Sequence, residues 1–178
     1  MEGTNKYTCS ICGLEHDQWP SIAWDAPVQY YELSEQDKEE LAQLSSDFCV
    51  INNTDGSMDR FIRCVLDQEV VSACEPLNYG VWVSLSQKSF EDYSAHYHDD
   101  DYEETYFGWL CTNIPEYEST VGIPTTVQTR AGGIRPIVVP HKDHPHPFVD
   151  DFYNGISLAE AEKRIFSATT AFRSRMTE

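Results

Sequence analysis

Hydrophobic and polar positions along the chain follow two different periods, and each period predicts a different kind of element. Apolar residues at alternate positions, or in short continuous runs, are typical of strands, whereas apolar residues three and four positions apart indicate one face of a helix. Runs of the first kind are rich in β-branched and aromatic residues, so they predict strands. They lie at 48–51, 61–66, 81–85, 106–111, 125–129 and 135–139.

Two short segments have helical spacing. Near 34–45, Ser34 and Asp37 resemble a capping box, and Leu41 and Leu44 lie three positions apart, which predicts a helix that ends near Ser45. Near 89–98, aromatic residues recur three and four positions apart, which predicts a second helix after a strand.

The longest helical pattern lies near the end of the sequence. Ser157 and Glu160 form a capping box, so the pattern predicts a helix from about 157 to 173. Apolar residues recur in it three and four positions apart, which predicts a buried face. These residues are Leu158, Ala161, Ile165, Ala168 and Phe172.

The order of these elements predicts the fold class. The polar turn 52–56 separates the strands 48–51 and 61–66, so we expect them to pair as a hairpin. Strands come in runs, with helices at both ends and in the middle, which favours an α+β fold with a mainly antiparallel sheet and a long C-terminal helix. The 178 residues suit a single domain, 1–178, with a compact knuckle at about 7–20.

The charge of the chain limits its partners. Thirty acidic and twelve basic residues give a formal net charge of −18, which repels phosphate backbones and anionic lipids. We therefore expect neither a nucleic acid nor a membrane as partner. The acidity has two interpretations, which are solubility and steering toward a basic protein partner.

One acidic run interrupts the middle of the chain, and it predicts an exposed loop or a frayed helix end. If the acidity serves recognition, this run is the candidate partner-binding segment, because it combines carboxylates with an aromatic anchor. The alternatives are a solvated surface and a cation site, and the latter would need carboxylates that converge. The run comprises Asp99, Asp100, Asp101, Tyr102, Glu103 and Glu104.

Cys9 and Cys12 form the strongest chemical motif, since two thiolates in a Cys-x-x-Cys spacing can bind one tetrahedral zinc. These two cysteines would supply two of the four ligands of a zinc site. His16 is a candidate third ligand, and one of the histidines in 141–146 is a candidate fourth. The alternatives are a reduced pair without metal and redox chemistry, which the position ahead of the sheet disfavours. Cys49 and Cys64 lie in predicted apolar strands.

Other catalytic patterns are weak. Ser84 and Ser86 lack the Gly-x-Ser-x-Gly elbow that exposes a nucleophile, and Gly132-Gly133 favours a turn over a phosphate cradle. Trp82 and Trp109 fall in predicted strands, where most rings belong to the core, although an outward ring beside the acidic run would suit a protein partner.

The chain has no long apolar stretch of roughly 20 residues. Its start, residues 1–7, is polar and lacks the apolar core of a signal peptide, so we expect a cytoplasmic protein with reduced cysteines.

Several distinctive sequence blocks are spread across the chain. Among them are Cys9-x-x-Cys12-Gly13-x-x-His16, Ser45–Ile51, Phe61–Leu66, Gly80–Ser86, Phe107–Cys111 and Gly132-Gly133-x-Arg135-Pro136. Together these blocks resemble the bacterial family catalogued as domain of unknown function 2199. The resemblance covers about residues 7–165, and it implies membership without an activity, because the family is named for its lack of one. The histidine-proline segment 144–147 departs from the family pattern.

Two classes of function remain. The first is a non-enzymatic protein-binding domain, whose most specific form is an immunity-type antitoxin that covers the active site of a basic toxin. The second is a zinc-containing module or metalloenzyme built around Cys9 and Cys12. The missing catalytic signature favours the first class.

Overall fold

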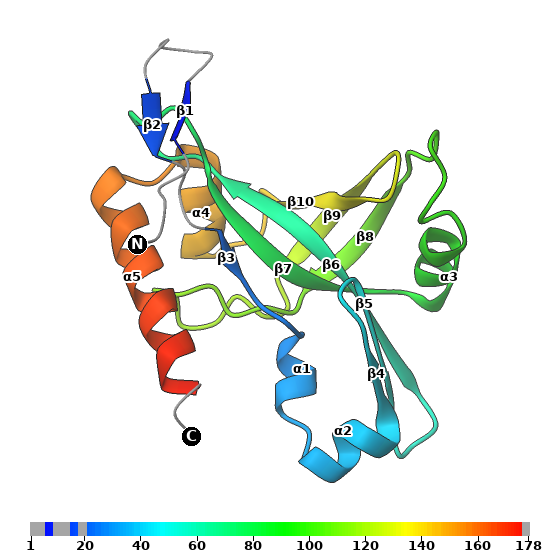
Figure 1. Cartoon of the computed structure of the whole chain (residues 1–178). Helices are drawn as coiled ribbons and strands as arrows, with labels where there is room; N and C mark the ends of the chain where they lie inside the picture. Colours follow the sequence, from blue (N-terminus) through cyan, green and yellow to red (C-terminus); the bar gives the residue numbers. More distant parts are fainter. Residues whose placement is uncertain (1–5, 9–14, 18–20, 176–178) are drawn as a thin grey trace.

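The computed structural model describes residues 6–8, 15–17 and 21–175, with side chains for 21–168. It is a mixed α+β structure in which a β-sheet forms the core (Figure 1). The large sheet has eight strands in the order β3-β7-β8-β9-β10-β6-β5-β4, and a further pairing joins β7 to β6. This pairing closes β6, β7, β8, β9 and β10 into a barrel.

The barrel strands follow one another along the chain. They are β6 (Met58–Gln68), β7 (Leu77–Leu85), β8 (Thr105–Leu110), β9 (Pro124–Arg130) and β10 (Ile134–Pro140). Each is antiparallel to the next. Because four reversals return the chain to its first direction, β10 runs parallel to β6, with Ile137 beside Val65. An odd number of strands therefore makes the closing pair parallel.

The remaining strands extend this barrel. β4 (Ala42–Leu44) and β5 (Phe48–Asn52) pair antiparallel with each other, and β5 pairs with β6. The predicted hairpin between 48–51 and 61–66 is therefore confirmed. β3 (Ile22–Ala23) runs parallel to β7, and β1 (Lys6–Thr8) pairs with β2 (Glu15–Asp17) in a separate two-stranded sheet.

Side chains at alternate strand positions point inward and fill the barrel. In β8, exposed and buried residues alternate without exception, so Tyr106, Gly108 and Leu110 face the core. Gly108 lies so close to β7 that a Cβ atom there would come within 2.3 Å of Val83 Cγ1 and 2.9 Å of the Ser84 carbonyl oxygen. The sequence needs glycine at this position because the interior has no room for a side chain.

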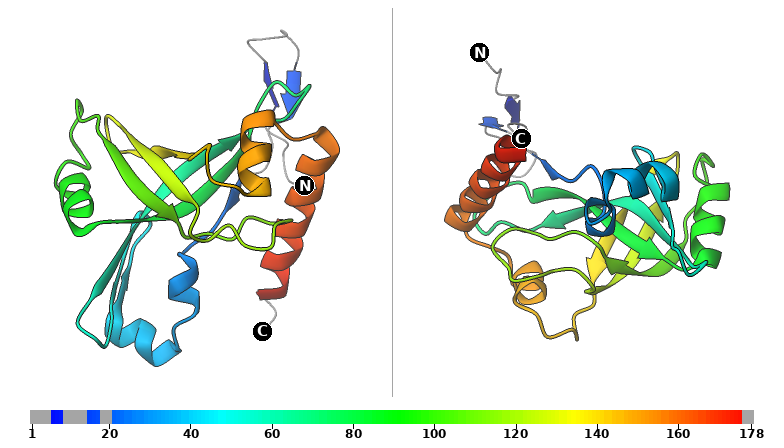
Figure 2. Two further views of the ribbon diagram at one scale, coloured as in Figure 1. Left: turned by 180° about the vertical axis from the view of Figure 1, so that it is seen from behind. Right: turned by 90° about the horizontal axis from the view of Figure 1, so that it is seen from below.

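Five helices in the described part of the chain surround the barrel. α1 (Val28–Tyr31) lies beside a second cluster of buried residues on the outer face of β6 and β7, which includes Trp82, and α2 (Glu35–Leu41) follows it and contacts β4. α3 (Gln87–Ala95) lies at one end of the barrel, and α4 (Pro147–Asn154) and α5 (Leu158–Arg175) lie at the other (Figure 2). No described helix is long and apolar enough to span a membrane.

The predicted helix at 34–45 begins correctly but is too long. Ser34 Oγ accepts a hydrogen bond from the Asp37 amide, as a capping residue should. The helix ends at Leu41, and the residues that follow form β4, whose backbone pairs with β5. Leu44 is therefore a strand residue and is 39% exposed. Pairing with the edge of β5 outweighs the helical spacing of the two leucines.

The helix predicted at 89–98 begins two residues earlier and ends at Ala95, because Ser86 Oγ accepts from the Ser89 amide and caps it. In α5, Ser157 Oγ accepts from the Glu160 amide, and Ala161 and Ala168 are buried. Leu158 was wrongly assigned to the buried face, since it is 50% exposed. The Phe172 side chain lies outside the described residues.

The sequence did not predict α4. Pro147 occupies its first turn, and His146 Nδ1 caps it by accepting from the Phe148 amide at 3.0 Å. Proline is compatible with the first turn of a helix, since the amide that it lacks has no partner there. Pro147 was therefore a sequence signal for the start of α4.

Candidate functional site

The acidic loop, residues 99–104, connects α3 to β8. Asp99, Asp100, Asp101, Glu103 and Glu104 are exposed, and Tyr102 is half-buried. The loop therefore presents five carboxylates to solvent, and its single aromatic side chain turns toward the protein.

Tyr102 anchors the acidic loop to α3. Its hydroxyl donates to Asp92 Oδ2 at 2.6 Å, and the hydroxyl of Tyr106 donates to the same oxygen at 2.7 Å. The two hydroxyls also contact each other. The His96 ring stacks on Tyr102 at 4.4 Å between ring centroids, almost in parallel. One carboxylate thus joins the helix, the loop and the first barrel strand after the loop.

The protonation states of this cluster suit an anchor. The hydrogen bonds from Tyr102 and Tyr106 lower the pKa of Asp92, so the carboxylate stays ionised. Burial, together with the bonds to Tyr102 and Asp92, raises the pKa of Tyr106, so its hydroxyl stays a donor. The sequence did not indicate Asp92, because no local pattern joins it to two tyrosines farther along the chain.

Backbone hydrogen bonds hold both ends of the acidic loop. At its start, the Gly132 amide donates to the Asp99 carbonyl at 3.1 Å. At its end, the Glu104 amide donates to Thr129 Oγ1 at 2.6 Å, and the Thr129 amide donates back to the Glu104 carbonyl at 2.9 Å. The segment is therefore an ordered loop fixed to β9 and to the β9–β10 turn, and the alternative of a frayed helix end is wrong.

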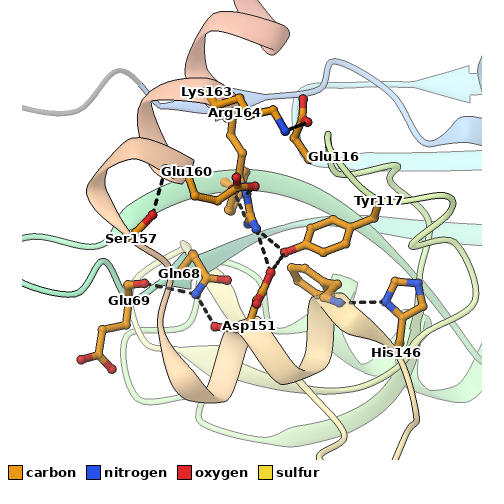
Figure 3. Close-up of polar contacts among 12 residues, drawn as sticks. Gln68, Glu69, Glu116, Tyr117, His146, Asp151, Ser157, Glu160, Lys163 and Arg164 are labelled. Atoms are coloured by element: carbon orange, nitrogen blue, oxygen red, sulfur yellow. Dashed lines mark hydrogen bonds and ion pairs between the residues drawn. The ribbon is translucent and has the colours of Figure 1, made fainter.

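A second polar cluster surrounds Arg164 of α5, whose side chain is fully buried (Figure 3). Its Nε donates to Glu160 Oε1 at 3.0 Å, and Nη2 donates to Asp151 Oδ2 at 3.1 Å. Nη1 donates to the hydroxyl of Tyr79 at 3.3 Å, and Nη2 also contacts the hydroxyl of Tyr117. The guanidinium thus connects α5 to α4, to β7 and to the β8–β9 connection.

The protonation states in this cluster follow from burial and from the neighbouring groups. Burial disfavours the charged form of Arg164, but the neighbouring Tyr79, Glu160 and Tyr117 outweigh it and raise its pKa. Burial and the 2.5 Å hydrogen bond to Asp151 raise the pKa of Tyr117, so its hydroxyl stays protonated. The cluster is built to hold the terminal helices in place. Its sequence signal was the Glu160–Arg164 spacing of four, which is typical of ion pairs on a helix.

Most of the predicted metal ligands lie outside the residues that the structure describes. Cys9 and Cys12 lie outside the described residues, and His16 is described only as the β2 residue in register with Tyr7. Within the described part of the chain, no group of three or more potential ligands comes together.

Cys49 and Cys64 lie in strands, as predicted, and burial raises the pKa of the Cys49 thiol to about 12. A thiol with so high a pKa is protonated at neutral pH and is a poor ligand or nucleophile.

Two of the histidines considered as a fourth ligand have other partners. His146 caps α4 through Nδ1 and contacts the Ser119 carbonyl through Nε2 at 2.7 Å, while His141 Nε2 lies 3.1 Å from Thr126 Oγ1. Gly132 and Gly133 have φ angles of 78° and 69° in the turn between β9 and β10. The turn that we expected from these glycines is therefore present.

The two candidate tryptophans differ. Trp82 is fully buried, and its indole N–H donates to the Trp24 carbonyl at 2.9 Å. Trp109 is 49% exposed, on the same strand as Phe107, which is also 49% exposed. Only Trp109 therefore remains available to a partner.

A bacterial family whose description reads "Uncharacterized protein conserved in bacteria", domain of unknown function 2199, matches residues 8–156. The chain belongs to this family. No curated protein and no solved structure matches the chain significantly. Domain of unknown function 2199 has no assigned activity, so the function must be argued from the geometry of the acidic loop and its surroundings.

Proposed function

We propose that this member of the family is a non-enzymatic protein-binding domain whose acidic loop recognises a basic partner protein. The observation that carries the proposal is the fixed, hydrogen-bonded conformation of the acidic loop. Five exposed carboxylates lie on a segment that is hydrogen-bonded at both ends and anchored in the middle by Tyr102. A loop that is already ordered loses little conformational entropy on binding, so the entropic cost of binding through its charges is small.

The net charge of −18 supports the same proposal. A strongly acidic surface speeds encounter with a cationic patch and disfavours acidic partners. The most specific form of the proposal is an immunity-type antitoxin in the cytoplasm, which would cover the active site of a basic toxin. Its support is the charge, the small size and the ordered acidic loop.

The test is the binding kinetics of a partner recovered by pull-down from the native host. Changing Asp99, Asp100 and Asp101 together to asparagine should lower the association rate roughly two- to tenfold at low salt, with a smaller effect on the dissociation rate. Added salt should reduce the difference, because the Debye length is about 8 Å at physiological ionic strength.

The matched control is a change of Glu32, Glu39 and Glu40 to glutamine, which removes three exposed charges from the region of α1 and α2. Equal effects of the two triple variants would mean that net charge acts without a specific loop. An acidic partner, or an association rate that ignores both salt and the loop variant, would contradict the proposal.

We infer as a second candidate that Cys9, Cys12 and His16 belong to a structural zinc site. The supporting observation is the pairing of β1 with β2, in which Thr8 lies opposite Glu15. Cys9 follows one paired strand directly, and His16 lies within the other. Zinc sites often stabilise short hairpins that have too small a core of their own.

Elemental analysis of tag-free protein should find zinc in stoichiometric amount. Changing Cys9 and Cys12 to serine should remove the metal and lower the melting temperature, because metal binding contributes to folding. Metal-free protein, with a double variant that melts like the wild type, would exclude the zinc site.

A further inference from the structure

Two large aromatic side chains lie together on the outside of the barrel. Phe107 and Trp109 both point outward from β8, and each is 49% exposed. Their rings meet edge to face, with centroids 4.9 Å apart and an interplanar angle of 87°. Isolated exposed apolar residues are ordinary in soluble proteins, but a contiguous aromatic pair on a sheet is typical of a binding surface.

The outer-face neighbours of this pair extend the surface. Across the ladder, Phe107 lies opposite Thr126 of β9, which lies opposite Val139 of β10, and Trp109 lies opposite Pro124. The His141 ring stands 5.5 Å from the Phe107 ring. Seen from behind, β8 and β9 face the viewer with no described helix over them (Figure 2). We call Phe107, Trp109 and His141 with these neighbours the aromatic face.

A groove of about 480 Å³ adjoins the aromatic face. The walls of the groove are formed by apolar and aromatic side chains and by the segment that follows β10. Lys142 also lines the groove, and its ammonium lies 5.3 Å from the centre of the Tyr153 ring, so an aromatic ring of this protein already has a cation near it. The groove is lined among others by Pro124, Thr126, Val139, Pro140, His141 and Tyr153.

The acidic loop leads directly into the strand that carries the aromatic face. Glu103 and Glu104, both exposed, directly precede β8, so the acidic loop and the two rings follow one another along one strand. Aromatic rings attract cations through their faces, and tryptophan does so most strongly. Carboxylates at the start of β8 and exposed rings farther along it therefore match a segment that carries arginine or lysine.

We infer that the aromatic face is the docking site for a basic segment of the partner, with an arginine or lysine side chain stacked on Trp109 or Phe107. The inference rests on the proposed function, and it adds the residues that give affinity after the acidic loop has brought the partner close. A second copy of this chain fits less well, because each copy carries a net charge of −18.

The test is an NMR titration of the wild-type protein with a capped tetra-arginine peptide, and with tetra-citrulline as the uncharged isostere. Tetra-arginine should shift the indole N–H resonance of Trp109, and tetra-citrulline should not. The buried Trp82 indole, bonded to Trp24, is the internal control. Trp109→Ala should weaken tetra-arginine binding roughly five- to tenfold with only a small change in the melting temperature.

The outcomes separate this inference from the proposed function. If the change of three loop aspartates weakens binding while the Trp109 resonance stays in place, the loop binds cations and the aromatic face does not. If the Trp109 resonance shifts equally with tetra-citrulline, the face has no preference for charge and the inference is wrong. A dimer in sedimentation that Trp109→Ala dissociates would assign the face to a second copy instead.

Discussion

Replacing Arg164 with methionine is expected to destabilise the fold by about 3–5 kcal/mol, because it breaks a buried ion-pair network. The guanidinium is fully buried and donates to two carboxylates and two tyrosine hydroxyls from different parts of the chain. Without it, Asp151 and Glu160 lose their counter-charge, and the hydroxyl of Tyr79 loses its donor. The free energy of unfolding in urea measures the effect.

Lys163 provides the control for this experiment. It precedes Arg164 on α5 and forms an ion pair with Glu116, but its side chain is 58% exposed. Lys163→Met should change the stability little, because exposed ion pairs are screened by solvent. If Arg164→Met and Lys163→Met unfold at the same urea concentration, Arg164 does not hold the terminal helices.

Replacing Trp82 with alanine is expected to cost about 3–5 kcal/mol, the usual range for large buried aromatic residues. Trp82 is 0% exposed and is the centre of the cluster between the outer face of β7 and α1. The change would leave a cavity and would deprive the Trp24 carbonyl of its hydrogen bond. The melting temperature and the urea midpoint should both fall.

Trp109→Ala is the matched comparison, since both tryptophans lie on neighbouring barrel strands. It removes a ring that is already 49% exposed, so we expect a much smaller loss of stability. Similar losses for the two variants would contradict the assignment of Trp82 to the core and of Trp109 to a binding surface.

Local patterns predicted most strands and the starts of two helices, α2 and α5. Alternation and β-branched residues placed all five barrel strands to within a few residues, although they missed the first four residues of β7. Ser34 and Ser157 cap helices as expected, since a cap depends only on a hydroxyl and an amide three residues away. These features depend on short-range chemistry, which a single sequence contains.

The boundaries of helices and strands were predicted poorly where they depend on contacts with residues far away in the sequence. The helix expected to reach Ser45 stops at Leu41 because β5 offers its edge to the next residues. α4 was missed because its cap is a histidine, whose ring nitrogen accepts from the helix only when the backbone places it there. The positions of Cys9 and Cys12 stay a prediction.

The sequence by itself determined the acidic loop, the net charge and the family, because these follow from composition and from residue order. Only the tertiary structure decided that β6 and β10 close a barrel, since Val65 and Ile137 are far apart in the chain and nothing local specifies their pairing. Only the tertiary structure decided which of Trp82 and Trp109 is exposed. Alternation assigns neighbouring residues to opposite faces of a strand, but which face another element covers depends on where the rest of the chain packs.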